Sequence, residues 1–384
     1  MSSAVIVDAI RTPSGRGKPS GALSAQHPVD LLGSVLNELV ARNDLDPAQV
    51  DDVIIGCLSQ VGQQSVNIAR NAALAAGFPE SVPGTTIDRQ CGSSQQATAF
   101  AAQGVIAGAY DVVIAGGIEL MSKNPIGYAT LGMDNWGPAL RDRYDDGLVG
   151  QGISAELIAA RWRLSRQALD EFAARSHRLA ASADFSTEIM AVGDVEKDET
   201  IRPGTTAESL AALKPAFEEE RYSQRFPEIE WRITAGNSSP LTDAASAVLI
   251  MSEERANHLG LRPRARFLHS VVVGSDPIEM LTGVIPATKR ILDRSGFSID
   301  DFDTYEINEA FASVPLAWQA EFEVDHNRIN PRGGAIALGH ALGSSGTRLL
   351  TTMINQLELT GGRYGLQVMC EGAGMANATI IERM

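Results

Sequence analysis

The chain has 384 residues, more than one hydrophobic core usually serves, so two or three packed units are expected. An apolar content of 44% and a charged content of 21% are typical of a folded globular protein and exclude an intrinsically disordered chain. The net charge of −15 argues against nucleic acid and anionic membranes as partners, and no apolar run approaches the ~20 residues of a membrane helix.

Strands and helices alternate along the first part of the chain. Nearly continuous apolar runs, typical of strands buried on both faces of a sheet, occupy 4–10, 53–57 and 111–117. Apolar residues at helical spacing cover 28–41 and 67–76. The first run follows Met1 without a basic segment, so we predict no signal peptide. The alternation predicts an α/β layered domain with a largely parallel sheet.

The composition changes at Glu119, after which charged and turn residues become more frequent. The clearest element here is a helix over 165–181, with Ser165 as its cap and one apolar stripe. The later segment 218–225 is predicted to be a surface excursion. We therefore predict an inserted lobe over 119–235.

Sheet character resumes at 247–251, and after a linker at 262–264 further strands are expected at 265–273, 304–307 and 366–370. The predicted division is an N-terminal half (1–118 and 236–258), the lobe (119–235) and a C-terminal half (259–384). The halves echo each other weakly, because Asp51 and Asp303 precede Cys91 and Gly343 by the same interval. Such a duplication would place Cys91 and the His340 loop at equivalent helix starts, facing each other.

Cys91 lies between a short strand-like run, 84–87, and a helical run, 93–107. A cysteine at a helix N-terminus has its thiolate stabilised by unpaired N–H groups and the helix dipole, and the thiolate is the nucleophilic form. The alternative is an inert cysteine in a core. Cys57, Cys91 and Cys370 cannot all pair and match no zinc spacing, so we predict no metal and expect reduced thiols in a cytoplasmic protein.

The second half supplies possible partners for this thiol. His340 is flanked by glycines in 333–346, which lets the backbone present the imidazole at a turn, although a core histidine is the alternative. Asn308 follows a buried strand, where α/β sites form, but asparagine also caps helices. Cys370 ends another strand before a glycine-rich loop whose N–H groups can stabilise an oxyanion. The remaining histidines are interpreted as structural or surface residues: His27, His177, His258, His269 and His326.

Four blocks in this order resemble the active-site blocks of the thiolase family: 89–94 (RQCGSS), 308–311 (NEAF), 333–346 (GGAIALGHALGSSG) and 370–374 (CEGAG). The segment 235–239 (AGNSS) resembles the family's coenzyme A loop. The resemblance covers essentially the whole chain. It implies a duplicated five-layer α-β-α-β-α fold with an inserted loop domain that covers the coenzyme A and substrate.

The resemblance also implies a role for each catalytic residue. Cys91 would attack the keto carbonyl of a 3-ketoacyl-CoA, with His340 accepting its proton, and Cys370 would act as acid and base. Asn308, through a water, and His340 would form one oxyanion hole, and the N–H groups of Cys91 and Gly372 the other. Coenzyme A would then thiolyse the acyl-cysteine, as a co-substrate with no bound cofactor.

Ser239 and Lys214 match coenzyme A contacts of the family, and Phe311 and Gln151 are further candidates for the substrate site. Short-chain thiolases carry His-Met-Gly where this chain has 150–152 (GQG), and the insertion at 218–231 is longer than in those members. Together with 89–96 (RQCGSSQQ), these departures resemble actinobacterial-type thiolases for bulky or steroid-derived acyl-CoA. Small residues at 150–152 would leave pocket volume. Ala341 replaces a frequent proline after the histidine, a change we expect to be tolerated.

Alternatives remain open from the sequence. A biosynthetic acetoacetyl-CoA thiolase shares every catalytic residue, and a ketoacyl synthase shares the fold but pairs cysteine with His-His or His-Asn. A non-catalytic acyl-CoA-binding relative is a third alternative, against which the four residues Cys91, Asn308, His340 and Cys370 argue. The resemblance implies a homodimer or homotetramer acting in fatty-acid or steroid side-chain β-oxidation.

Overall fold

The computed structural model describes residues 3–144 and 147–384. Met1 and Ser2, where the predicted N-terminal half begins, and residues 145–146 of the predicted lobe lie outside the described residues. The first-half elements are β1 (Ala4–Arg11), β2 (Gly15–Arg16), α1 (Pro28–Arg42), β3 (Asp52–Gly56), α2 (Ile68–Ala75), β4 (Gly84–Ile87), α3 (Ser93–Ile106), β5 (Val112–Leu120), β6 (Thr242–Ser252) and α9 (Glu253–His258). The helices and strands predicted in this part are confirmed, with ends that differ by a few residues.

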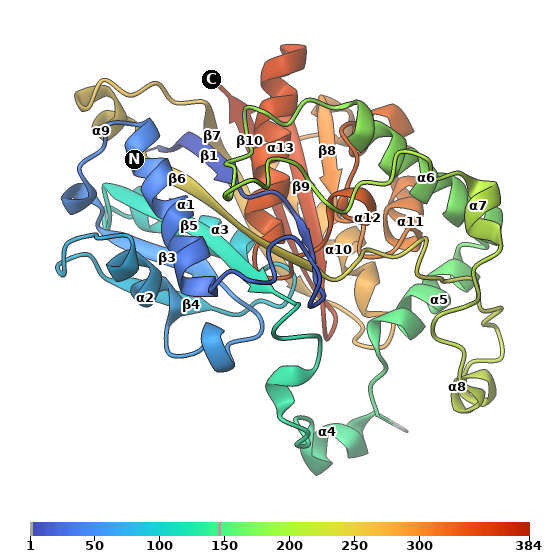
Figure 1. Cartoon of the computed structure of the whole chain (residues 1–384). Helices are drawn as coiled ribbons and strands as arrows, with labels where there is room; N and C mark the ends of the chain where they lie inside the picture. Colours follow the sequence, from blue (N-terminus) through green and yellow to red (C-terminus); the bar gives the residue numbers. More distant parts are fainter. Residues whose placement is uncertain (1–2, 145–146) are drawn as a thin grey trace.

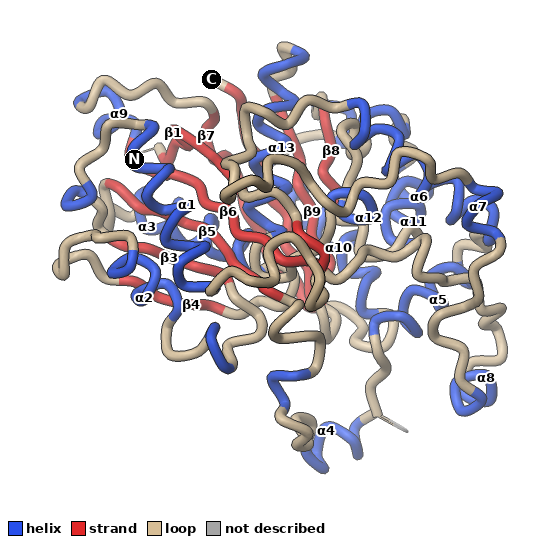
Figure 2. Tube along the Cα trace, viewed as in Figure 1, coloured by secondary structure: helices blue, strands red, loops and turns tan. Residues whose placement is uncertain are grey.

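The second half repeats the plan of the first (Figure 1). Its elements are β7 (Ala265–Gly274), α10 (Val284–Ser295), β8 (Thr304–Ile307), α11 (Ser313–Phe322), α12 (Ala335–Leu338), α13 (Ser345–Thr360), β9 (Tyr364–Glu371) and β10 (Met375–Arg383). The strand order is β4-β3-β5-β6-β1-β7-β10-β9-β8, so β1 and β7, the first strand of each half, meet in the middle. Figure 2 shows the strands as one band with helices along it.

The prediction of a largely parallel sheet is wrong, because the sheet mixes parallel and antiparallel pairs. The pairs β3–β4, β3–β5 and β8–β9 are parallel, whereas β6 and β10 run antiparallel to both neighbours. Strand β10 follows β9 through a tight turn, and β6 returns from a long excursion. A strand buried on both faces has the same apolar sequence whichever way it runs, so the direction was not readable from composition.

The packed layers follow from which helices touch which face. Helices α1 and α2 cover the outer face of the first-half strands, α10 packs on the outer face of the second-half strands with α11 against it, and α3 and α13 lie together between the halves. Strand β1 shows how one sequence serves two layers. Val5 and Ile10 pack in the outer cluster, and Ile6 and Ala9 pack in the central one with residues of α13. A register shift between Ile6 and Asp8 breaks the usual two-residue alternation.

Most of the chain between β5 and β6 lies outside these layers, at the lower and right parts of Figure 1. It forms α4 (Gly137–Arg143), α5 (Gln151–Arg161), α6 (Arg166–Ser182), α7 (Ala207–Ala211) and α8 (Glu220–Arg225). The predicted cap of α6 is confirmed, because the Ser165 side chain accepts a hydrogen bond from the Ala168 N–H. Within the described ranges, no helix is both long and apolar enough to cross a membrane.

Candidate active site

Cys91 lies in a tight turn that joins β4 to α3. The turn is closed by hydrogen bonds from the Gly92 N–H to the Arg89 carbonyl oxygen and from the Ser93 hydroxyl to the Gln90 carbonyl oxygen. Gln90 adopts a left-handed conformation with φ of 50°, which an L-residue rarely takes without a structural demand. The sequence thus folds back on itself at this point and fixes the direction of the thiol.

The Cys91 thiol is 1% exposed and packs in a small apolar cluster with Met121, Leu342, Leu349 and Met369. Burial raises its pKa well above the ordinary value, and the nearby Cys370 adds to the rise. The helix start by itself predicted a lowered pKa. Desolvation outweighs that effect here, so the thiol is neutral at rest and needs a base to become a nucleophile.

Two helix N-termini meet next to this thiol. A side chain at Gly346 of α13 would overlap the backbone N–H of Gln95 in α3, so only glycine allows the helices to approach this closely. The Thr347 N–H also donates to the Ser94 hydroxyl at 3.0 Å. The predicted facing of the Cys91 turn and the His340 loop is therefore built into the contact between α3 and α13.

His340 lies in the loop before α13 and is held at both its backbone and its ring. Its backbone N–H donates to the Thr242 hydroxyl at 2.9 Å, and its Nδ1 lies 2.7 Å from the Ser345 hydroxyl, which itself donates to the Ala341 carbonyl. Since that hydroxyl proton is used, Nδ1 is the protonated nitrogen and Nε2 is the acceptor nitrogen. Burial, with the positive charge of Arg348, lowers the His340 pKa to about 3. The imidazole is therefore a neutral base at ordinary pH.

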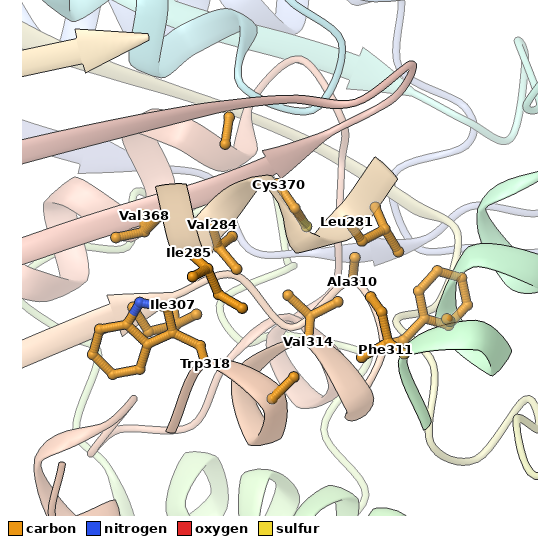
Figure 3. Close-up of a cluster of buried hydrophobic side chains, with 14 of the residues drawn as sticks. Leu281, Val284, Ile285, Ile307, Ala310, Phe311, Val314, Trp318, Val368 and Cys370 are labelled. Carbon is orange, nitrogen blue, oxygen red and sulfur yellow. The ribbon is translucent and has the colours of Figure 1, made fainter. Parts of the chain in front are cut away.

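Asn308 links this histidine to the second cysteine. Its Nδ2 lies 3.5 Å from His340 Nε2, and the same side chain hydrogen-bonds Cys370. Cys370 lies near the end of β9 on the face that bears Leu366 and Val368, and Figure 3 shows it within that apolar cluster. Burial raises the Cys370 pKa to about 12, so this group is also a neutral thiol at rest.

The turn between β9 and β10 closes over the start of α3. Gly372 lies against the Gln90 side chain, and the Glu371 carboxyl fills the space that a side chain at Gly92 would occupy. Neither Glu371 carboxyl oxygen has a hydrogen-bond partner among the described residues, and burial raises the Glu371 pKa to about 9. A protonated, uncharged acid therefore packs behind Cys91.

Two buried carboxyl groups that the sequence analysis did not single out hold these loops in place. Glu119, near the end of β5, accepts hydrogen bonds from the N–H groups of Leu58, Ser59 and Gly343 and from the Gln64 amide. Glu309, next to Asn308, accepts from Ser176, Asn330 and the Ile336 N–H. In the sequence, each appears only as a carboxylate at or just past the end of a buried strand. Many surface residues occupy such positions, so the pattern did not identify these two.

A cavity of about 600 Å³ opens beside His340 and Gln151. Its wall combines apolar and polar side chains: Met121, Ile126, Trp136, Ile153, Phe217, Tyr222, Ser239, Leu241, Phe311 and Leu342, with Glu219 and Arg221. The volume lies within the range of small-molecule sites, ~300–1,000 Å³. Cys91, Asn308 and Cys370 are buried and do not line the cavity.

The four candidate substrate residues are placed differently. Gln151 and Phe311 line the cavity, and Ser239 does so while both its N–H and its hydroxyl donate to the Ala310 carbonyl. Lys214 is exposed and does not line the cavity. The structure thus brings together three of these four with the catalytic candidates.

Two expectations about the cavity need correction. A side chain at Gly152 would overlap the Phe217 ring, so Phe217 fills the volume that a small residue there was expected to leave open. A Cβ atom at Gly150, by contrast, would have no neighbour within 4 Å among the described residues. The segment 218–225 is also more than a surface excursion, because Glu219, Arg221 and Tyr222 line the cavity.

The arrangement supports covalent chemistry on a carbonyl group. It combines a thiol at a helix start, a neutral imidazole and a second buried thiol. The Asn308 amide contacts both the imidazole and the second thiol. In the described part of the chain, no group of three or more His, Cys, Asp or Glu side chains is arranged to hold a metal ion.

Comparisons with known proteins give a consistent result. The family profile described as "Thiolase, N-terminal domain" matches residues 4–254, and "Thiolase, C-terminal domain" matches residues 261–383. The steroid 3-ketoacyl-CoA thiolase FadA6 of Mycobacterium tuberculosis is 47% identical over 100% of this chain and 95% of its own length. A 3-ketoacyl-CoA thiolase of Serratia proteamaculans is 43% identical, with 100% of both chains covered. The crystal structure of the Bacillus anthracis acetyl-CoA acetyltransferase superposes with a TM-score of 0.87 at 36% identity, covering 100% of this chain and 99% of that one.

Proposed function

The chain belongs to the thiolase family, and we propose that it cleaves 3-ketoacyl-CoA with coenzyme A. The products are acetyl-CoA, or another short acyl-CoA, and a shortened acyl-CoA. The observation that carries the proposal is the convergence of Cys91, His340, Cys370 and Asn308 where α3 meets the loop before α13. Coenzyme A is a substrate of this reaction, and no bound cofactor is required.

In the first step, His340 Nε2 takes the Cys91 proton, and the thiolate attacks the keto carbonyl carbon of the substrate. The bond between this carbon and the α-carbon breaks, and its electron pair stays on the α-carbon of the departing acetyl-CoA. Cys370 donates its proton to that carbon and becomes a thiolate. Burial raises the Cys370 pKa to about 12, so the thiol keeps its proton until a strong base, the carbanion, forms beside it.

In the second step, the Cys370 thiolate takes the proton of the incoming coenzyme A thiol. The coenzyme A sulfur attacks the acyl-cysteine carbonyl and expels Cys91, which recovers its proton from His340. The Asn308 amide, through a water, and His340 stabilise the thioester oxygen, and the N–H groups of Cys91 and Gly372 stabilise the acyl-enzyme oxygen. Gly372 lies against the side chain of Gln90, the residue before Cys91, which supports this pairing of the two N–H donors. Losing one donor of this type costs ~10²–10³-fold in rate.

For the substrate, we propose an acyl group that is bulky or ring-bearing, processed in fatty-acid or steroid side-chain β-oxidation. Two observations support it: the mainly apolar cavity of about 600 Å³ and the 47% identity to a relative named as a steroid 3-ketoacyl-CoA thiolase. Ser239, Phe311 and Gln151 would line the path of the substrate. Lys214 is proposed only as a surface contact for the coenzyme A phosphates, since its charge is exposed.

The test is the rate of thiolysis for a series of 3-ketoacyl-CoA substrates, together with the rate of acetoacetyl-CoA synthesis from acetyl-CoA. A clear preference for long or ring-bearing substrates in the thiolytic direction is expected. A strong acetoacetyl-CoA preference would refute the bulky-substrate proposal, and faster condensation would favour the biosynthetic alternative. Loss of all activity in Cys91→Ala separates catalysis from the acyl-CoA-binding alternative.

Further proposals concern organisation and location. The division into an N-terminal half, a lobe over 119–235 and a C-terminal half is supported by the repeated element order on either side of that segment. A homodimer or homotetramer is proposed from family membership, to be tested by light scattering. A cytoplasmic location is proposed because Cys91 and Cys370 must both remain reduced for this chemistry.

A further inference from the structure

Gln151 stands between the cavity and the nucleophile. It is the first residue of α5, it lines the cavity, and its Nε2 lies 3.9 Å from Cys91 Sγ. Cys91 itself is 1% exposed and does not line the cavity. The Gln151 amide therefore joins the cavity wall to the sulfur, as Met121 and Leu342 do through apolar contacts.

The surroundings of the sulfur give this contact its importance. The cluster around Cys91 is apolar, and among the described residues Gln151 is the side chain that hydrogen-bonds its sulfur. A thiolate in an apolar setting is costly, and a hydrogen bond from a fixed N–H donor offsets part of that cost. The Gln151 amide offers such a donor on the cavity side.

We propose that Gln151 is a catalytic residue whose amide N–H stabilises the Cys91 thiolate. The thiolate occurs twice in the reaction, when Cys91 attacks the substrate and when coenzyme A expels it from the acyl-enzyme. This inference rests on the proposed function for its consequences in turnover. The stabilisation of the sulfur itself does not depend on any substrate.

The surroundings also define what else can affect the pKa of this thiol. Burial, Cys370 and Glu371 disfavour the charged form of Cys91, and the neutral imidazole of His340 lies in the loop before α13. These groups are common to wild type and to Gln151 variants. A difference in the Cys91 pKa between the two therefore reports the amide.

The experiment is alkylation of the full-length enzyme by iodoacetamide from pH 6 to 10, with the modified residue identified as Cys91 by peptide mass. Gln151→Met replaces the donor with an apolar side chain of similar length. Since the Cys91 pKa lies above this range, the alkylation rate is proportional to the thiolate fraction throughout it. A hydrogen bond to a charged group corresponds to about one pKa unit or more, so we expect the rate of Gln151→Met to fall about tenfold at every pH tested.

Two further variants complete the test. Gln151→Asn keeps an amide but is shorter by one methylene, and its alkylation rate is expected to fall as in Gln151→Met. Gln103→Met, the same substitution on the exposed face of α3, should leave the rate unchanged. A rate in Gln151→Met equal to or above that of wild type overturns the proposal and leaves Gln151 as a wall of the cavity. Because alkylation needs no acyl-CoA, failure of the proposed thiolysis would not affect this readout.

Discussion

Glu119 provides the strongest test of how the loops of the site are held together. Its Oε1 accepts hydrogen bonds from the Ser59 N–H and the Gln64 amide, and its Oε2 accepts from the N–H groups of Leu58 and Gly343, at 2.8–3.1 Å. Glu119→Gln replaces one oxygen with an NH₂ group that faces two donors. The substitution keeps the size of the side chain and changes only its charge and hydrogen bonding.

The magnitude follows from the number of donors left without an acceptor. Each buried donor that loses its partner costs ~1–3 kcal/mol, so two donors correspond to roughly 2–6 kcal/mol. Burying the Glu119 carboxylate is costly, as its raised pKa shows. The amide in Glu119→Gln avoids this cost, which offsets part of the loss. We therefore expect the free energy of unfolding of Glu119→Gln to fall by about 2–4 kcal/mol.

The assay is urea unfolding followed by circular dichroism, with Glu196→Gln, a substitution at an exposed position, as the control. The maximal rate of thiolysis should fall as well, because Gly343 belongs to the loop that carries His340. A free energy of unfolding for Glu119→Gln within about 0.5 kcal/mol of wild type, as expected for the control, would refute the reasoning.

Three further predictions concern the base, the turn beside the nucleophile and acid stability. Ser345→Ala removes the partner of His340 Nδ1, so kcat should fall about tenfold with little change in KM, and an unchanged kcat would contradict the assigned tautomer. Gly92→Ala forces a methyl group into the Glu371 carboxyl, and a loss of about 1–3 kcal/mol in unfolding free energy is expected from chemical denaturation, whereas wild-type stability would show that the turn adapts. Burial lowers the pKa of His177 to about 4, below the ordinary 6.5, so the unfolded chain binds this proton first, and stability should fall as the pH drops from about 6.5 towards 4. His177→Gln should make unfolding midpoints less sensitive to pH in this window, and an unaltered pH dependence would exclude His177 as a source of acid lability.

Much of the fold was readable from the sequence because its strands and helices carry strong local patterns. Strand β8 and the cap of α6 were predicted at the residues where they occur. Strand direction was not predicted, because a doubly buried strand is uniformly apolar in either orientation. The edge-to-edge meeting of β1 and β7 joins residues more than two hundred positions apart, which no local pattern encodes.

Residue types at fixed spacing were enough to establish the family, the alternation of strands and helices, and the four chemical groups of the site. The protonation of Cys91 emerged only from the packed fold, since burial reverses the effect of the helix start on its pKa. The same holds for the role of position 151. On the sequence Gln151 marked a place in a pocket of small residues, but the fold of α5 brings its amide to the sulfur of Cys91. A side chain's partner lies wherever the packing of distant elements places it, and that packing is a property of the whole chain.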